Sequence, residues 1–152
     1  MATIFKIAEP SDAEMLVQFM REYCAFDQLP FEEENRHRTV AQFIQNSQLG
    51  RLWVIYAGEE PIGYLALTLG YSFEFGGYDA FVDEIYIRAD YRGCGIGTLA
   101  LQIAENACRT LHVRALHLEV ERNNVNAQAL YRKVGFVEHD RYLLTKRIAP
   151  RG

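Results

Sequence analysis

The chain of 152 residues lacks any long apolar stretch. No run approaches the roughly 20 residues that a membrane-spanning helix needs. Glu9 and Pro10 interrupt the N-terminal segment where a signal peptide would need a continuous apolar core. Positive charge is not in excess either, because 16 Lys and Arg stand against 20 Asp and Glu. Since nucleic-acid-binding proteins generally carry a basic face, we expect no nucleic-acid or membrane partner and a cytoplasmic location.

Metal-binding and disulfide patterns are also lacking. The three cysteines, Cys24, Cys94 and Cys108, cannot all pair, and their spacing matches neither a zinc ribbon nor a CxxC motif. The four histidines form no recognisable metal-ligand spacing. We therefore expect reduced thiols and no metal, with Cys94 serving as a small loop residue.

The remaining composition is ordinary for a globular protein, with 49% hydrophobic and 24% charged residues. The length fits one domain over residues 1–152. Periodicity predicts helices at about 11–24, 31–47, 97–110 and 124–134, the first opened by a capping box of Ser11 and Glu14. It predicts strands at 3–9, 80–87, 114–120 and 141–147, and a hairpin over 51–71 that turns at 58–61. Strands interspersed with helices indicate an α/β or α+β sheet domain.

A glycine-rich segment, RGCGIGT, begins at Arg92 and lies between a predicted strand and a predicted helix. It is not a Walker loop, because no lysine follows Gly97. Gly95, Gly97 and Ala100 do match a dinucleotide-binding fingerprint, with Glu119 at the expected distance. Against that alternative, RADYR separates the strand from the glycines, and too little chain follows Ala100 for a doubly wound sheet.

Two sequence blocks support a third interpretation. The first is R-x-x-G-x-G at Arg92, Gly95 and Gly97, preceded by the strand DEIYI and followed by a helix. The second is N-x-x-A-x-x-L-Y-x-x-x-G-F, from Asn124 to Phe136. Together, and in this order, they resemble the GCN5-related N-acetyltransferase (GNAT) superfamily. The resemblance implies a mixed, mostly antiparallel, twisted sheet of six to seven strands flanked by about four helices. It also implies that the sheet splays between the motif strand and the next.

The resemblance further implies acetyl-CoA as acyl donor. The glycine loop and the following helix N-terminus would bind its pyrophosphate, since bare N–H groups and the helix dipole favour an anion. The motif strand would pair with the pantetheine arm and supply one N–H as an oxyanion donor. The cofactor-binding residues implied are Ile85, Tyr86, Ile87, Arg92, Gly93, Cys94, Gly95, Ile96, Gly97, Thr98, Asn124, Ala127 and Tyr131.

The implied reaction is direct attack of an amine on the acetyl carbonyl, with the coenzyme A thiolate leaving. Tyr131 matches the motif tyrosine that commonly acts as general acid toward that thiolate. An alkyl amine has a pKa of about 10 and must lose a proton before it attacks. Asp83 and Glu84 on the motif strand are the candidate bases. Because successive strand residues face opposite sides, we expect only one of them at the acceptor site, with Glu84 preferred.

The acceptor pocket of such enzymes is built from the first two helices and the loop before the motif strand. The candidate substrate-binding residues are Tyr23, Phe26, Asp27, Phe75 and Glu84. Aromatic rings beside carboxylates suit a small cation, so we expect a primary amine such as a polyamine, amino acid or aminoglycoside-type amine. A peptide N-terminus or a lysine remains an alternative acceptor. A cofactor-binding sensor without turnover is a further alternative, and a homodimer is one assembly that the resemblance implies.

Overall fold

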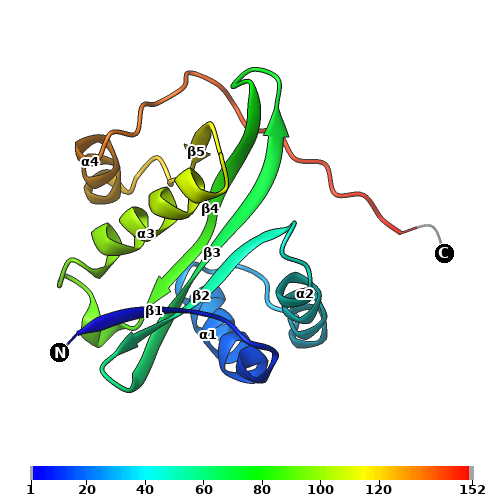
Figure 1. The fold of residues 1–152 in the computed structure, drawn as a ribbon, viewed down its shortest axis with the longest axis vertical. Coiled ribbons are helices and arrows are strands. Elements are labelled where there is room, and N and C mark those ends of the chain that lie inside the picture. Colours follow the sequence, from blue (N-terminus) through cyan, green and yellow to red (C-terminus); the bar gives the residue numbers. More distant parts are fainter. Residues whose placement is uncertain (1, 151–152) are drawn as a thin grey trace. The chain divides into compact units, whose positions relative to one another are not determined.

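The computed structural model describes residues 2–150 (Figure 1). The chain divides into two compact units, Met1–Glu119 and Val120–Gly152, which are described separately below. Within residues 2–150 no helix is long and apolar enough to cross a membrane.

The first unit is built on one five-stranded sheet with the strand order β1-β2-β3-β4-β5. Its strands are β1 (Thr3–Ile7), β2 (Gly50–Ala57), β3 (Glu60–Ser72), β4 (Gly77–Ile87) and β5 (Ala115–His117). The first four pair antiparallel, each with its neighbour in the chain, whereas β5 pairs with β4 in parallel. The predicted mixed, mostly antiparallel sheet is confirmed.

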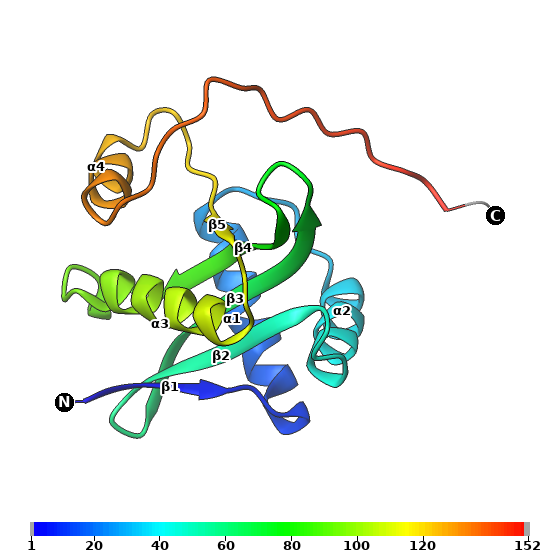
Figure 2. The same ribbon diagram turned by 45° about the horizontal axis from the view of Figure 1, so that its top comes forward.

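Three helices of this unit pack on the sheet: α1 (Ala13–Phe26), α2 (Glu33–Gln45) and α3 (Ile96–Thr110) (Figures 1 and 2). The residues of β2 show which face of the sheet each helix covers, because successive strand residues face opposite ways. Leu52 and Val54 belong to the core that α1 and α2 cover, while Ile55 clusters with Ile96 at the start of α3. The sheet therefore lies between α1 and α2 on one face and α3 on the other.

Strand β4 contains a β-bulge at Asp83. Ala66 of β3 lies opposite Glu84 and Leu67 lies opposite Val82, so Asp83 is the extra residue without a partner position. On its other side β4 pairs with β5 only over Asp79–Phe81. The predicted splay between these two strands is thus confirmed, and it leaves the second half of β4 without a β5 partner in this unit.

The second unit contains α4 (Val125–Lys133), capped by Asn124, whose side-chain Oδ1 accepts from the Ala127 amide at 3.2 Å. Beyond α4 the structure assigns no strand through residue 150, so the strand predicted at 141–147 is wrong and the sheet has five strands instead of six to seven. Tyr142, Leu143 and Leu144 form the short apolar run expected of a strand but are 84%, 73% and 88% exposed. Such a run alone does not make a strand, because its backbone groups also need a partner strand.

The start of α1 and the length of β5 also differ from the sequence prediction. The capping box predicted from Ser11 and Glu14 is wrong: a 3₁₀ turn (Pro10–Asp12) precedes α1, and the reciprocal bonds involve Glu9 and Asp12 instead. The proline at Pro10 starts this turn, because its fixed φ suits the first position of a helical segment. Strand β5 is also shorter than the predicted 114–120, since the splay ends its pairing at His117.

Gly63 sets the distance between β3 and the end of β4. A Cβ built on Gly63 would lie 1.9 Å from the Tyr86 carbonyl oxygen, a backbone atom of the neighbouring strand. We predict that Gly63→Ala lowers the free energy of unfolding by about 1–3 kcal/mol, as overpacking does. Urea denaturation measures this. Gly70→Ala is the control, because its nearest atom is a carboxylate oxygen of Asp79, which can rotate away. Equal losses in both variants would contradict the prediction.

Candidate active site

The glycine loop ends on the first turn of α3. Gly93 and Gly95 have φ of 76° and 82°, the left-handed region that favours glycine, and Gly95 is the N-cap of the helix. Gly97 lies inside the first turn without a positive φ. A Cβ built on any of the three meets no atom within 4 Å. The fold therefore does not itself require glycine at 97, and the space over the helix N-terminus is open to a ligand.

The side chain of Arg92 closes this loop. Its Nε donates to the Ile87 carbonyl at 2.7 Å, and its guanidinium lies 4.3 Å from the centre of the Phe26 ring. Phe26, predicted to contact substrate, is therefore stacked under Arg92 at the end of α1, although it stays 65% exposed. Cys94 is exposed, and its thiol lies 3.6 Å from the Arg92 carbonyl.

The predicted pantetheine segment lies where β4 has lost β5 as a partner. Ile85 and Ile87 are half-buried, while Tyr86 is buried and donates its hydroxyl to Glu22 at 2.9 Å. Their side chains therefore act as core. The main-chain groups on the splayed edge of this segment are the part that a ligand could pair with.

The two candidate bases, Asp83 and Glu84, are not placed on opposite faces of the sheet as the sequence predicts. Asp83 and Glu84 line the same cavity, beside Arg36 of α2 and Thr68 of β3. The structure brings both side chains to one cavity, because the bulge interrupts the alternation of β4 at this point. Which of them faces the acceptor stays a prediction.

Glu84 is held firmly in place. The Arg36 guanidinium donates to both of its carboxylate oxygens, at 3.0 and 3.1 Å, and the Tyr64 hydroxyl donates at 2.8 Å. The side chains of Arg36 and Glu84 are 23% and 15% exposed. Three charge-assisted or hydroxyl bonds thus occupy the Glu84 carboxylate.

Asp83 has no comparable partner. Within residues 2–150 it forms no hydrogen bond or ion pair, and its side chain reaches solvent. Partial burial raises the pKa of Asp83, and the negative charge of Glu84 raises it further, while Arg36 opposes the shift. The site therefore contains one carboxylate, Glu84, that is paired with Arg36 and one, Asp83, that is free to take a proton.

Tyr23 packs beside Tyr64, whose hydroxyl bonds Glu84. Its ring contacts those of Tyr64 and Tyr86 edge-on, with 6.4 Å between centroids in each case. Burial raises the pKa of Tyr23, and the charges of Glu84, Asp27 and Asp83 raise it further. Tyr23 is thus exposed to the negative charge of both candidate bases.

Phe75 lies beside another pair of side chains. Its ring centroid is 5.0 Å from that of His117, which bonds Asp79 at 3.1 Å. Phe75 is therefore held near the β4–β5 pairing, and its predicted substrate contact stays a prediction.

Sequence reasoning missed Arg36 and Tyr64, the two residues that bind Glu84. Arg36 precedes Val40 by one helical turn, and Val40 is the fully buried residue of α2. A basic residue on the buried stripe of an otherwise polar helix was the available signal. Tyr64 gave no such signal, because an aromatic residue in a strand is usually core.

The remaining predicted residues lie in the second unit. Asn124 caps α4 and Ala127 donates to it, which is the structural role that its position allows. The Tyr131 ring lies 6.0 Å from that of Phe136, and burial raises the pKa of its hydroxyl. Their roles toward a cofactor stay predictions. Residues 2–150 contain no group of three metal-ligating side chains.

Comparison with known proteins identifies the family. The family model described as "Acetyltransferase (GNAT) family" matches residues 16–136. The chain belongs to this family. The prediction that the chain is a GNAT-family, acetyl-CoA-dependent N-acetyltransferase is therefore confirmed. The dinucleotide-binding alternative loses its support.

Relatives of this GNAT protein agree with the assignment. A thialysine N-epsilon-acetyltransferase from Caenorhabditis elegans is 30% identical over 129 residues, covering 84% of this chain and 79% of the relative. A solved integron cassette protein from the mobile metagenome of Cole Harbour Salt Marsh is 35% identical, with a TM-score of 0.85 over 97% of this chain and 91% of its own. A predicted acetyltransferase from Clostridium acetobutylicum, solved with acetyl-CoA, shares the fold at 17% identity and a TM-score of 0.81, covering 95% and 96% of the two chains.

The open space at Gly97 gives a direct test of ligand contact. We predict that Gly97→Ala leaves the free energy of unfolding unchanged or higher, since a Cβ there meets no protein atom and alanine favours helix. The same change should weaken acetyl-CoA binding about tenfold, equivalent to ~1.4 kcal/mol, because the methyl group occupies space needed by the ligand. Calorimetric titration and urea denaturation measure the two effects.

Gly95→Ala is the matched control for Gly97→Ala. Its φ of 82° places a side chain in the left-handed region, which costs roughly 1–2 kcal/mol. It should therefore lose stability whether or not a ligand binds. Unchanged acetyl-CoA affinity in Gly97→Ala would show that the ligand does not approach this glycine.

Proposed function

We propose that the protein transfers the acetyl group of acetyl-CoA to a small primary amine, and that Asp83 accepts the proton of the attacking nitrogen. The observation that carries the proposal is the bulge in β4. It brings two carboxylates to one cavity, of which Arg36 and Tyr64 engage one and leave the other free.

The chemistry requires such a free carboxylate. A protonated amine has no lone pair to attack with, and its pKa is about 10 in water. Once Asp83 has taken a proton, the nitrogen forms a bond to the acetyl carbon. The nitrogen then loses its second proton to solvent as the carbon–sulfur bond of the thioester breaks, and the electron pair leaves with the coenzyme A sulfur. A raised pKa suits Asp83 to this task, because general bases work best with a pKa near the operating pH.

Glu84 supports the site without taking the proton. Its lone pairs are directed at Arg36 and at the Tyr64 hydroxyl. Protonating it would break a half-buried ion pair and leave the guanidinium without its counter-charge. This favours Asp83 over Glu84, the residue that the sequence alone favoured. The Glu84 charge also contributes to catalysis indirectly, since it raises the pKa of Asp83.

The proposed cofactor site is based on the family resemblance and on the open space at the glycine loop. Backbone N–H groups of the segment from Arg92 to Thr98 bind the pyrophosphate at the N-terminus of α3. The splayed edge of β4 at 85–87 pairs with the pantetheine arm, and one N–H there stabilises the oxyanion. Asn124 and Ala127 contribute to the cofactor arm, and Tyr131 donates a proton to the leaving thiolate. The Tyr131 hydroxyl has a proton to give, because the tyrosine pKa of about 10 lies above neutral pH and burial raises it further.

The acceptor is a small cationic amine. The charges of Asp27 and Asp83 both act on the Tyr23 hydroxyl, and the charge of Glu119 acts on Asp83. An ammonium group between carboxylates and an aromatic ring is stabilised by both. The relative from Caenorhabditis elegans is named for thialysine, which is an amine. Polyamines, amino acids and aminoglycosides therefore form the test panel. Cytoplasmic location and a homodimer stay predictions.

Asp83→Asn tests the proposed base. We predict a fall in kcat/KM of about 10²–10⁴-fold, the usual effect of losing a general base. In the wild type, kcat/KM should decline as the pH falls through the raised pKa of Asp83, and this limb should be missing in the variant. Coenzyme A thiol release with the best amine of the panel measures both. No release with any amine, despite acetyl-CoA binding, would indicate the sensor alternative instead.

Stability provides the internal check on Asp83→Asn. An acid whose pKa is raised by folding stabilises the protein only at low pH, and that contribution is lost as the pH rises through the raised pKa. At pH 7 the variant should therefore have an unchanged or higher Tm.

Glu84→Gln is the contrasting variant. It removes the charge facing Arg36, and we expect it to lower the free energy of unfolding by about 1–3 kcal/mol. If Glu84→Gln folds but is inactive while Asp83→Asn stays active, the assignment of the base is reversed.

A further inference from the structure

Helix α2 covers the sheet without filling the space beneath it. Of its 13 residues only Val40 is buried. A cavity of about 130 Å³ lies between α2 and the sheet, and Asp83 and Glu84 form its β4 wall. The cavity therefore begins at the carboxylates of the proposed acceptor site and continues under the helix.

The floor of this cavity crosses three strands. Glu84, Ala66 and Leu52 lie directly opposite one another on β4, β3 and β2. At a strand spacing of about 4.8 Å, the floor runs on the order of 10 Å away from the carboxylates. Beyond Glu84 this row is apolar, with Thr68 beside it on β3, and Val40 of α2 forms part of the wall opposite the sheet.

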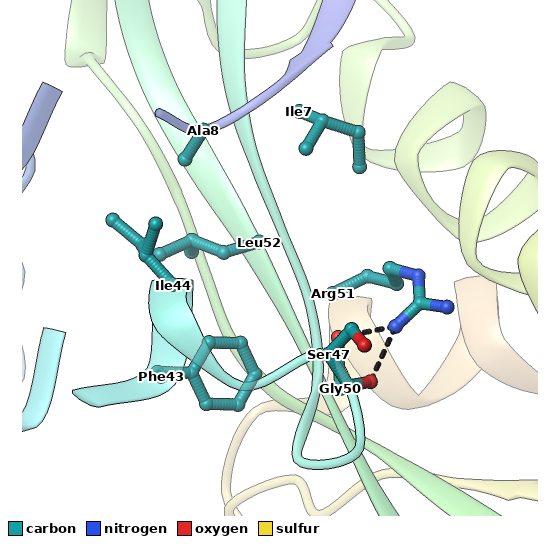
Figure 3. A pocket seen from close by; sticks show the side chains of 8 residues that line it. All are labelled: Ile7, Ala8, Phe43, Ile44, Ser47, Gly50, Arg51 and Leu52. Carbon is teal, nitrogen blue, oxygen red and sulfur yellow. Dashed lines mark hydrogen bonds between the residues drawn. The ribbon is translucent and has the colours of Figure 1, made fainter. Parts of the chain in front are cut away.

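Phe43 lies where this cavity meets a second one. Together with Leu52 it lines both this cavity and the second, which has a volume of about 280 Å³ and includes Ile7 and Arg51. Figure 3 shows the Phe43 ring beside Leu52 and Gly50, with Ile7 and Arg51 further along the second cavity. A Cβ on Gly50 would lie 2.8 Å from the Phe43 ring. Because glycine at position 50 has no side chain, the Phe43 ring packs against β2 as a partition between the two cavities.

We propose that the cavity under α2 binds the carbon chain of the acceptor amine, and that Phe43 limits the length of chain accepted. The proposal rests on the proposed function, because Asp83 fixes the amine at the mouth of the cavity. A cavity of roughly 150 Å³ holds one benzene molecule, so this one takes on the order of six carbon atoms. The acceptor class is accordingly a short aliphatic primary amine, whose chain lies between Val40, Ala66 and Leu52.

A homologous series of unbranched amines tests the proposal. Coenzyme A thiol release is measured with ethylamine through octylamine at saturating acetyl-CoA. For the wild type, kcat/KM should rise about fourfold for each methylene group that the cavity buries, and then fall once the chain reaches Phe43.

Two variants should move this optimum in opposite directions. Phe43→Leu shortens the partition and should favour longer amines, while Ala66→Val narrows the floor and should favour shorter ones. Phe5→Leu is the control, because it removes the same atoms from the opposite face of the sheet, where Phe5 packs beside Ile55. Its optimum should match that of the wild type. Acetyl-CoA affinity should be unchanged in all three.

The possible failures are distinguishable. If acetyl-CoA binds but no amine is acetylated, the proposed function fails and the chain subsite fails with it. If amines are acetylated at rates independent of chain length, only the chain subsite is overturned. An optimum that stays in place in both Phe43→Leu and Ala66→Val, in folded proteins, also overturns it.

Discussion

The site depends on one extra residue in β4. Before the bulge, Val82 pairs with Leu67, and after it Glu84 pairs with Ala66, on the next position of β3. The alternation of the strand is thereby reversed. Tyr86 lies in the core under α1 and α2, and Ile87 packs on the opposite side with Ile55. If Asp83 instead paired regularly with Ala66, Glu84 would lie opposite Leu65 and face the side covered by α3, where no basic residue of α2 could reach it.

The bulge places charge where the protein must compensate for it. Two carboxylates in one cavity repel each other, and burial adds to the cost of ionising both. Arg36 neutralises one of them with a bidentate bond, and the Tyr64 hydroxyl adds a third contact to Glu84. The remaining repulsion acts on Asp83 and raises its pKa. Because these contacts engage the Glu84 carboxylate, Asp83 is the one left to accept a proton.

Local sequence signals predicted the elements that depend on neighbouring residues. The glycines before Ile96, the hairpin turn after Ala57 and the stripe of α1 each act over a few residues, and the structure has an element at each place. The bulge was not predictable in this way, because AFVDEIYI contains no glycine or proline to mark an irregularity and only pairing with β3 reveals the extra residue. The contact between Arg36 and Glu84 spans 48 positions and depends on how α2 crosses the sheet. The C-terminal strand failed for a related reason, since a strand requires a partner that its own sequence does not supply.

Strand β4 also joins the loop that would bind cofactor to the helix that borders the acceptor side. Arg92 donates to the Ile87 carbonyl at the end of β4 and stacks on Phe26 at the end of α1. Arg88 forms an ion pair with Glu22, one turn earlier in α1, and Glu22 also accepts the Tyr86 hydroxyl. These contacts fix the end of α1, and with it Tyr23, relative to the strand that carries Asp83. Because an acyl transfer requires the two reactants to be held in one geometry, a shared strand that anchors both sides is a direct way to achieve it.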